Sequence, residues 1–162
     1  MHDRLAETGR CAPRIDGRSR YAACMIATQK FEVSTNGQGD ARDITENVAA
    51  AVAACQTRDG IVSVFVVGST AGITTIEFEP GAIADLNGLF ERLAPRGGEY
   101  RHHLRWGDNN GSSHVRAALL GPSLTVPLAD GTLMLGTWQQ IMLLEFDTQP
   151  RRREIVVQII GE

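Results

Sequence analysis

Two histidines and one glutamate in this sequence have side chains that suit a divalent metal ion. His102, His114 and Glu77 lie in three separate segments of the chain. Imidazole nitrogen and carboxylate oxygen are common metal ligands, and a set of three leaves a coordination position open for water or a substrate. We therefore predict that these side chains converge on one pocket at a subunit boundary, where they bind a divalent ion, magnesium or zinc, or act as catalytic groups themselves.

Each histidine also has a structural interpretation. An imidazole close to a turn can satisfy the unpaired groups at a helix end, and His102, His103 and His114 all lie near turn-forming residues. The chain contains no compact metal motif such as H-E-x-x-H, so spacing by itself does not establish metal binding. Asp108 and Glu79 are additional carboxylates that could complete a site.

The small-residue segment Gly68-Ser69-Thr70-Ala71-Gly72 is a candidate phosphate-binding loop. Its backbone N–H groups and the hydroxyls of Ser69 and Thr70 can approach a phosphate closely. Arg101 and Arg116 flank the histidines and are candidate phosphate clamps. The alternative is that the segment is a tight corner between two strands and that the arginines are ordinary surface residues. A serine nucleophile is disfavoured, because the motif Gly-x-Ser-x-Gly is absent.

Alternation of polar and apolar residues places Glu77 on a strand. Over 73–79 the alternation puts Glu77 on the polar face of that strand. The preceding strand, 61–67, is apolar on both faces, so we expect it to be central in a sheet or covered by a neighbouring subunit.

The histidines fall on two further elements. We expect His102 and His103 on or beside a short polar strand at 100–106, and His114 in the first turns of a helix at 112–120. The other expected elements are strands at 26–35, 124–128, from Thr132, at 138–146 and at 154–160, and helices that begin at Asp43 and Pro80. About seven strands with two to three helices, and strands dominating the second half, predict an α+β fold.

Composition indicates one globular domain. The 162 residues suit a single core, with 43% hydrophobic and 22% charged residues. A net charge of −3 removes the electrostatic case for general nucleic-acid binding, and no apolar run approaches the length of a membrane helix. Three cysteines without metal-type pairing and the absence of an apolar leader favour the cytoplasm. Residues 1–24 lack a sustained period, which predicts a flexible extension before a domain at 25–162.

Several long motifs resemble the YjbQ-like family. They are GSTAGITTIE (68–77), YRH (100–102), NGSSHVRAALLGPSL (110–124) and LGTWQQ (135–140), followed by EFD (145–147) and QIIGE (158–162). The resemblance covers about 25–162 and leaves out only the N-terminal extension. Because several motifs occur in a fixed order, the resemblance is highly specific.

The resemblance implies a compact fold around a twisted β-sandwich or barrel-like sheet, and assembly as a homotrimer. It also implies that His102, His114 and Glu77 are the metal ligands or catalytic residues. One position departs from the family pattern, because many relatives begin the loop with His-Thr-Thr-Ala-Gly where this chain has Gly68. A site with three histidines is therefore not available from these motifs, and Glu77, Asp108 or water has to complete it.

Members of the family resembled are often labelled secondary thiamine-phosphate synthases. Such an enzyme joins a pyrimidine-methyl diphosphate to a phosphorylated thiazole and releases pyrophosphate, whose charge a divalent ion would neutralise. In this interpretation Ser69 and Thr70, with Arg101 or Arg116, hold phosphate.

Trp138 and Gln139, in an unusual junction of polar and aromatic residues, would then also bind the substrate, with Trp138 stacked on a substrate ring. The alternative is that Trp138 is a core residue, as a tryptophan in a strand ordinarily is. Two other functions stay open. One is a metal-dependent hydrolase of a phosphorylated or cyclic small molecule, and the other is a non-catalytic trimeric protein that binds a metabolite. The implied partner is a small phosphorylated metabolite, and bound metal together with turnover separates an enzyme from a binding protein.

Overall fold

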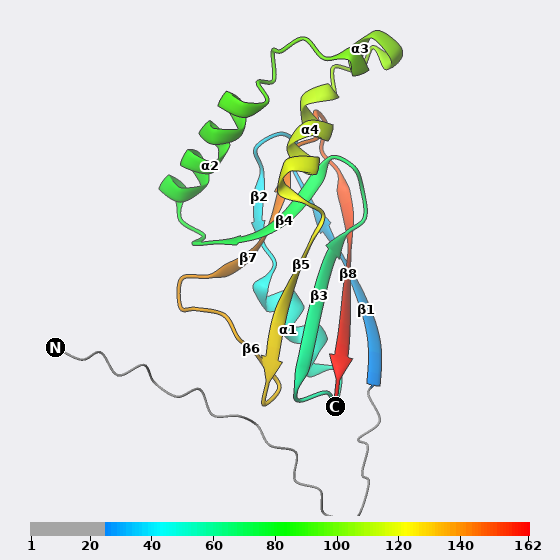
Figure 1. Ribbon diagram of the computed structural model, residues 1–162, viewed down its shortest axis with the longest axis vertical. Helices are drawn as coiled ribbons and strands as arrows, with labels where there is room; N and C mark the ends of the chain where they lie inside the picture. Colours follow the sequence, from blue (N-terminus) through cyan, green and yellow to red (C-terminus); the bar gives the residue numbers. More distant parts are fainter. Residues whose placement is uncertain (1–24) are drawn as a thin grey trace, which may run out of the picture.

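The computed structural model describes residues 25–162, and the extension expected at 1–24 lies outside these described residues. Eight strands and four helices form an α+β fold in the described part, which confirms the predicted class (Figure 1). The strands are β1 (Met25–Ser34), β2 (Ala41–Asp43), β3 (Gly60–Val66), β4 (Ala71–Ile76), β5 (Ser123–Ala129), β6 (Thr132–Leu133), β7 (Gln140–Glu145) and β8 (Arg152–Gly161). The helices are α1 (Thr45–Ala53), α2 (Pro80–Leu93), α3 (Arg101–Trp106) and α4 (Gly111–Leu120).

The strands pair into two sheets. The five-stranded sheet has the order β1-β8-β3-β5-β6, and the three-stranded sheet has the order β2-β7-β4. Every pairing is antiparallel. Buried aliphatic side chains from both sheets and from α1 form one core cluster, to which β3 contributes Val62, Val64 and Val66. Figure 1 shows α2, α3 and α4 gathered at one end of the molecule, where α4 contacts β4.

Carboxylate side chains mark the starts of two helices. Asp43 accepts a hydrogen bond from the Thr45 N–H at 2.9 Å, so α1 begins slightly later than expected. Glu79 accepts hydrogen bonds from the N–H groups of Gly81 and Ala82 at 2.7 and 2.8 Å, and these bonds lower the pKa of Glu79. Glu79 is therefore a helix cap. None of the four helices in residues 25–162 is long and apolar enough to span a membrane.

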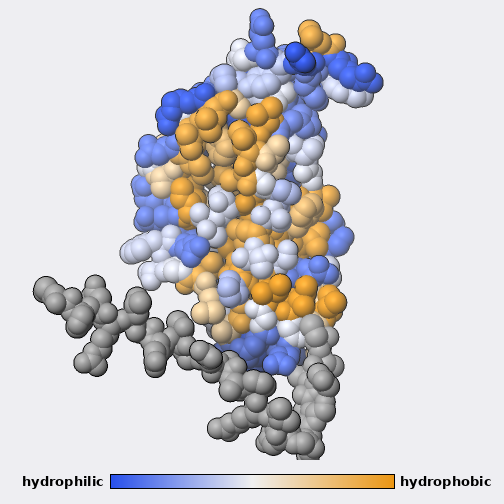
Figure 2. Space-filling view, viewed as in Figure 1, coloured by the Kyte–Doolittle hydropathy of each residue, from blue (hydrophilic) through white to orange (hydrophobic). Residues whose placement is uncertain are grey.

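β3 has a different environment on each of its two apolar faces. It lies in the middle of the five-stranded sheet, as the two-sided pattern predicted, and one face packs into the core. Ile61 and Phe65, on the opposite face, are 44% and 41% exposed, and Val67 directly after the strand is 46% exposed. Figure 2 shows hydrophobic residues gathered over the sheet and, separately, over α2 and α4. The sheet thus has an uncovered apolar face in a single chain.

Candidate functional site

His102 and His103 lie on a short helix, α3, and the prediction of a strand at 100–106 was wrong. The helix ends at Gly107, whose φ of 67° is left-handed and whose N–H donates to the carbonyl of His103 at 2.9 Å. Glycine adopts this conformation without strain and is common at the C-terminal end of a helix. The helix is too short to show a helical period of apolar residues in the sequence, which is why it was not predicted.

His102 and His114 face one another across α3 and α4. Their ring centroids are 4.6 Å apart and the ring planes are inclined at 41°. Asp108 places Oδ1 3.4 Å from Nδ1 of His102, and this nitrogen is buried without a hydrogen-bond partner among the described residues. A buried polar atom left unpaired costs about 1–3 kcal/mol. The pair therefore has an open hydrogen-bonding position that a proton, water or ligand can complete.

His103, the neighbour of His102 in sequence, has a structural role. Its Nε2 accepts a hydrogen bond at 3.2 Å from the N–H of Gly111, the first residue of α4. Its ring also packs edge-on against Tyr100, with centroids 5.4 Å apart. One of the first four N–H groups of α4 is thus satisfied by an imidazole. Adjacent histidines therefore divide into a helix cap and a candidate functional group.

Glu77 is not brought to the histidine pair within one chain. It is exposed just after the end of β4, and its carbonyl accepts a hydrogen bond from the N–H of Glu79 at 2.9 Å. Across residues 25–162, no three His, Cys, Asp or Glu side chains are grouped so that they could hold a metal ion. Of the three predicted ligands, the fold of a single chain unites His102 and His114.

A pocket of about 340 Å³ brings His114 together with the small-residue loop. Gly68, Ser69 and Ala71 line it from the connection between β3 and β4, and His114 lines it from α4. The rest of the lining consists of Ala117, Ala118 and Pro122. The loop is a corner between two strands, as one interpretation held, and it is also one wall of a pocket of small-molecule size.

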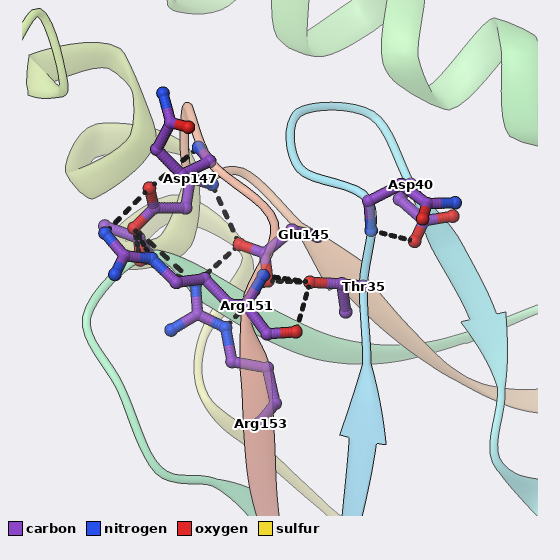
Figure 3. Close-up of polar contacts among 9 residues, drawn as sticks. Thr35, Asp40, Glu145, Asp147, Arg151 and Arg153 are labelled. Atoms are coloured by element: carbon purple, nitrogen blue, oxygen red, sulfur yellow. Dashed lines mark hydrogen bonds and ion pairs between the residues drawn. The ribbon is translucent and has the colours of Figure 1, made fainter.

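Thr70, the second hydroxyl of the loop, belongs to a buried polar network (Figure 3). Arg153 donates to Thr70 Oγ1 at 2.7 Å, and Thr70 donates to Asp147 at 2.9 Å. Arg153 also donates to both carboxylate oxygens of Glu145, at 2.7 and 2.5 Å, and Thr35 donates to Glu145 at 2.8 Å. The side chains of Glu145 and Arg153 are only 0% and 8% exposed. The network therefore ties the loop rigidly to β7 and β8.

The network makes stability depend on acid pH through Asp147. Burial acts to raise the pKa of this carboxyl, but hydrogen bonds from Arg151, the Gln149 N–H and Thr70 outweigh it and hold the pKa below its ordinary value. A folded pKa below the unfolded value of about 3.9 stabilises the protein at higher pH, and this contribution is lost as the pH falls through the folded value.

Below about pH 5, the unfolding free energy of wild type should therefore fall more steeply with decreasing pH than that of Asp147→Asn, as measured by urea titrations at several pH values. Equal slopes would contradict the prediction.

Arg116, a predicted phosphate clamp, is 2% exposed and connects two helices. Its Nε donates to the carbonyl of Ala94 at 2.9 Å, and its Nη2 donates to Glu91 at 2.6 Å. The hydrogen bond from Arg116 lowers the pKa of Glu91. The guanidinium is thus engaged inside the protein, between α4 and the end of α2.

The other predicted substrate-binding residues, Arg101, Trp138 and Gln139, do not line the histidine pocket. Arg101 is exposed on α3. Trp138 is 71% exposed between β6 and β7, so the core interpretation of this tryptophan was wrong. Gln139 donates to Thr75 Oγ1 at 3.1 Å and lines a separate groove between β4 and β5. The structure therefore groups Ser69 with His114 and distributes the remaining candidates.

The buried carboxylates and Arg153 were not identified as site-forming residues from the sequence. Glu145 ends an apolar run and Arg153 precedes another. Charges at the ends of buried strands have to be paired, because an isolated buried charge is very unfavourable. The charged residues at the ends of these apolar runs therefore indicated that buried ion pairs exist, but the sequence does not show that Glu145 pairs with Arg153.

Relatives and solved structures match most of the chain. The family model for "UPF0047 protein YjbQ-like" matches residues 29–162. A UPF0047 protein of Methanocaldococcus jannaschii is 36% identical over 134 residues, which cover 82% of this chain and 94% of the relative. A UPF0047 protein of Archaeoglobus fulgidus is 40% identical over 118 residues, which cover 73% of this chain and 89% of the relative.

The fold is shared with crystal structures of proteins from two archaea. A YbjQ-like protein of unknown function from Sulfolobus solfataricus superposes with a TM-score of 0.77 at 30% identity, covering 85% of this chain and all of that protein. A hypothetical protein from Aeropyrum pernix gives the same TM-score and identity, covering 84% of this chain and 99% of that protein. Together with the match over residues 29–162, these similarities show that the chain belongs to the UPF0047, YjbQ-like family.

Proposed function

We propose that the protein is an enzyme acting on small phosphorylated metabolites, and that it joins a pyrimidine-methyl diphosphate to a thiazole phosphate to form thiamine phosphate. One observation carries the proposal: His114 lines a small-molecule pocket opposite the Gly68-Ser69 loop and faces His102, whose Nδ1 lacks a partner among the described residues. Two facing imidazoles beside a pocket are suited to moving protons at a reacting group.

The reaction balances without an oxidant or reductant. The thiazole nitrogen forms a bond to the methylene carbon of the pyrimidine, while the bond from that carbon to the diphosphate oxygen breaks and its electron pair leaves with pyrophosphate. His114 donates a hydrogen bond or proton to the departing oxygen, and Asp108, whose Oδ1 lies 3.4 Å from Nδ1 of His102, orients the imidazole of His102. Ser69, on the opposite wall, donates its hydroxyl to a phosphate oxygen.

The histidine pair also fits a divalent ion, since the buried Nδ1 of His102 makes no hydrogen bond within residues 25–162. His102 and His114 would hold the ion, and imidazole ligands favour zinc over magnesium. Such an ion, when bound, supplies positive charge for the diphosphate. Because Glu77 lies outside this grouping in one chain, further ligands have to come from a second copy, water or the substrate.

Turnover with both substrates tests the proposal. Protein purified without an affinity tag is incubated with the pyrimidine diphosphate and thiazole phosphate, with zinc, magnesium or a chelator, and the products are separated by chromatography. We expect thiamine phosphate and pyrophosphate in equal amounts, and rescue of a strain that lacks its thiamine-phosphate synthase. Phosphate release from one substrate alone would instead indicate the hydrolase, and binding without turnover would indicate the metabolite-binding protein. Either result contradicts the synthase.

We also propose that the chain assembles as a homotrimer through the uncovered face of the five-stranded sheet. Ile26, Ile160 and Ile61 are register partners across β1, β8 and β3, and they form an apolar row. Phe65 pairs with Val156 in a second row on the same face. A polar row of Thr28, Gln158 and Ser63 lies between the two apolar rows. Exposed apolar rows on an uncovered sheet face are typical of an interface between subunits.

Sedimentation equilibrium checks this assembly. At micromolar concentration we expect three chain masses for wild type and one for Phe65→Glu, because the charge would lie in an apolar contact. Phe78→Glu is the matched control, since Phe78 is 53% exposed between β4 and α2 and lies off the sheet face. A monomeric wild type would contradict the trimer, and dissociation by Phe78→Glu alone would contradict the sheet-face interface.

A further inference from the structure

The guanidinium of Arg153 has one nitrogen that the buried network leaves unused. Nε donates to Glu145, and Nη2 donates to Glu145 and Thr70. Nη1 makes no hydrogen bond in the described part of the chain, and it is not one of the buried polar atoms that lack a partner, so this nitrogen is accessible although the whole side chain is only 8% exposed. A guanidinium carries five N–H donors, and the two on Nη1 remain free to donate to an acceptor that approaches this nitrogen.

Gly68 leaves the space beside this nitrogen open. A Cβ added at Gly68 would lie 2.8 Å from Arg153 Nη1, closer than real Cβ contacts allow. The φ of Gly68 is 148°, a backbone conformation that residues other than glycine rarely adopt. In Figure 3 the nitrogen of Arg153 without a dashed line points toward the loop that joins β3 and β4. The missing side chain of Gly68 thus gives access to a buried cation.

This opening adjoins the histidine pocket. Gly68 and Ser69 line that pocket together with His114, and Thr70, two residues after Gly68, is held by Arg153 itself. We propose that Arg153 Nη1 is the donor of an anion subsite, which binds a carboxylate or phosphate oxygen of the small molecule that enters the pocket over Gly68. The inference rests on the proposed function and deepens it, because it assigns a group next to that pocket, behind Gly68, that recognises the anionic end of the ligand.

Local charge decides the kind of recognition. Arg153 and Arg151 face two carboxylates, Glu145 and Asp147, so the network has no excess positive charge. Attraction of a dianion by net charge is therefore small, and recognition rests on one oriented, charge-assisted hydrogen bond from a fixed nitrogen. Glu145 holds the guanidinium through two bonds, so little side-chain entropy is lost when an oxygen binds.

The first experiment needs no variant. The nitrogen resonances of the arginine side chains are followed by NMR in wild-type protein with chelator present, while inorganic phosphate or acetate is added. We expect the Arg153 guanidinium resonances to shift saturably with at least one anion, and the anion that binds more tightly identifies the source as phosphate or carboxylate. Absence of any saturable shift at Arg153 with both anions overturns the proposal.

Two matched variants then locate the donor. Arg153→Lys keeps a positive charge beside Glu145 but removes Nη1, and the dissociation constant of the bound anion should rise about tenfold. Arg151→Lys changes the other arginine of the network, which pairs with Asp147, and should leave that constant nearly unchanged. Unchanged affinity in a folded Arg153→Lys, or an equal loss in both variants, overturns the assignment. Because the assays use simple anions and no metal, they give an answer even where the synthase reaction fails.

Discussion

Replacing Glu145 with alanine should lower the free energy of unfolding by about 3–5 kcal/mol, the cost of removing one partner from a buried ion pair. Glu145 is 0% exposed and accepts hydrogen bonds from Arg153, from Thr35 and from the Asp147 N–H. Without it, the Arg153 guanidinium would remain buried beside Thr70 with most of its donors unpaired. The effect should appear in urea denaturation as a lower midpoint with an unchanged slope.

Glu154→Ala is the control for this comparison. Glu154 also pairs with a basic residue, Lys30, at 3.1 Å, but the two side chains are 41% and 57% exposed. Exposed pairs contribute about 0–1 kcal/mol, so this variant should lose little stability. If Glu145→Ala and Glu154→Ala lose the same amount, the buried network does not stabilise the fold in the way described.

His114→Ala should lower turnover by about 10²–10⁴-fold, the usual contribution of a positioned acid or base. The side chain is partly buried, and no hydrogen bond from its imidazole to the described residues holds the fold together, so the melting temperature should change little. The ring centroid lies 4.6 Å from that of His102, and the ring lines the pocket with Ser69. Removing the imidazole therefore leaves the departing phosphate oxygen without its proton donor. Product formation with both substrates is the measurement.

His103→Ala separates catalysis from helix capping. The imidazole of His103 satisfies the N–H of Gly111, so this variant should lose stability, by about 0.5–2 kcal/mol, as other helix caps do. Its turnover, measured below the melting temperature, should stay near that of wild type. Comparable losses of turnover in His103→Ala and His114→Ala would contradict a catalytic role specific to the facing pair.

The sequence predicted those turns and helices that are determined by interactions between residues close together in the chain. Asp130-Gly131 forms the expected turn of the β5–β6 hairpin, with φ of 50° and 74°. Pro80 begins α2, and Val48 and Val52 bury one face of α1, as their helical spacing indicated. In each case the deciding interactions lie within a few residues of one another.

Features that depend on distant partners were not predictable in the same way. The strand expected at 100–106 is helical, because Gly107 and the contacts of His103 with Gly111 and Tyr100 outweigh weak local preferences. The motif pattern placed His102 and His114 in one site, and the fold brings them together, but the position of Glu77 in one chain could not be read from alternation alone. Alternation of polar and apolar residues shows which face of a strand a side chain lies on, but it does not show which other element packs against that face.

The position of β8 has a consequence for how the chain is made. β8 lies between β1 and β3 in the sheet, yet it is the last of these strands to leave the ribosome. Thr28, near the start of β1, pairs with Gln158, near the end of β8, so β1 has no neighbour in the sheet until β8 has been synthesised. Pairings this distant in sequence are associated with slow folding, because a long loop has to close first. Until β8 has been made, the nascent chain therefore carries unpaired edges on β1 and β3, and such exposed edges are sites where chains can aggregate.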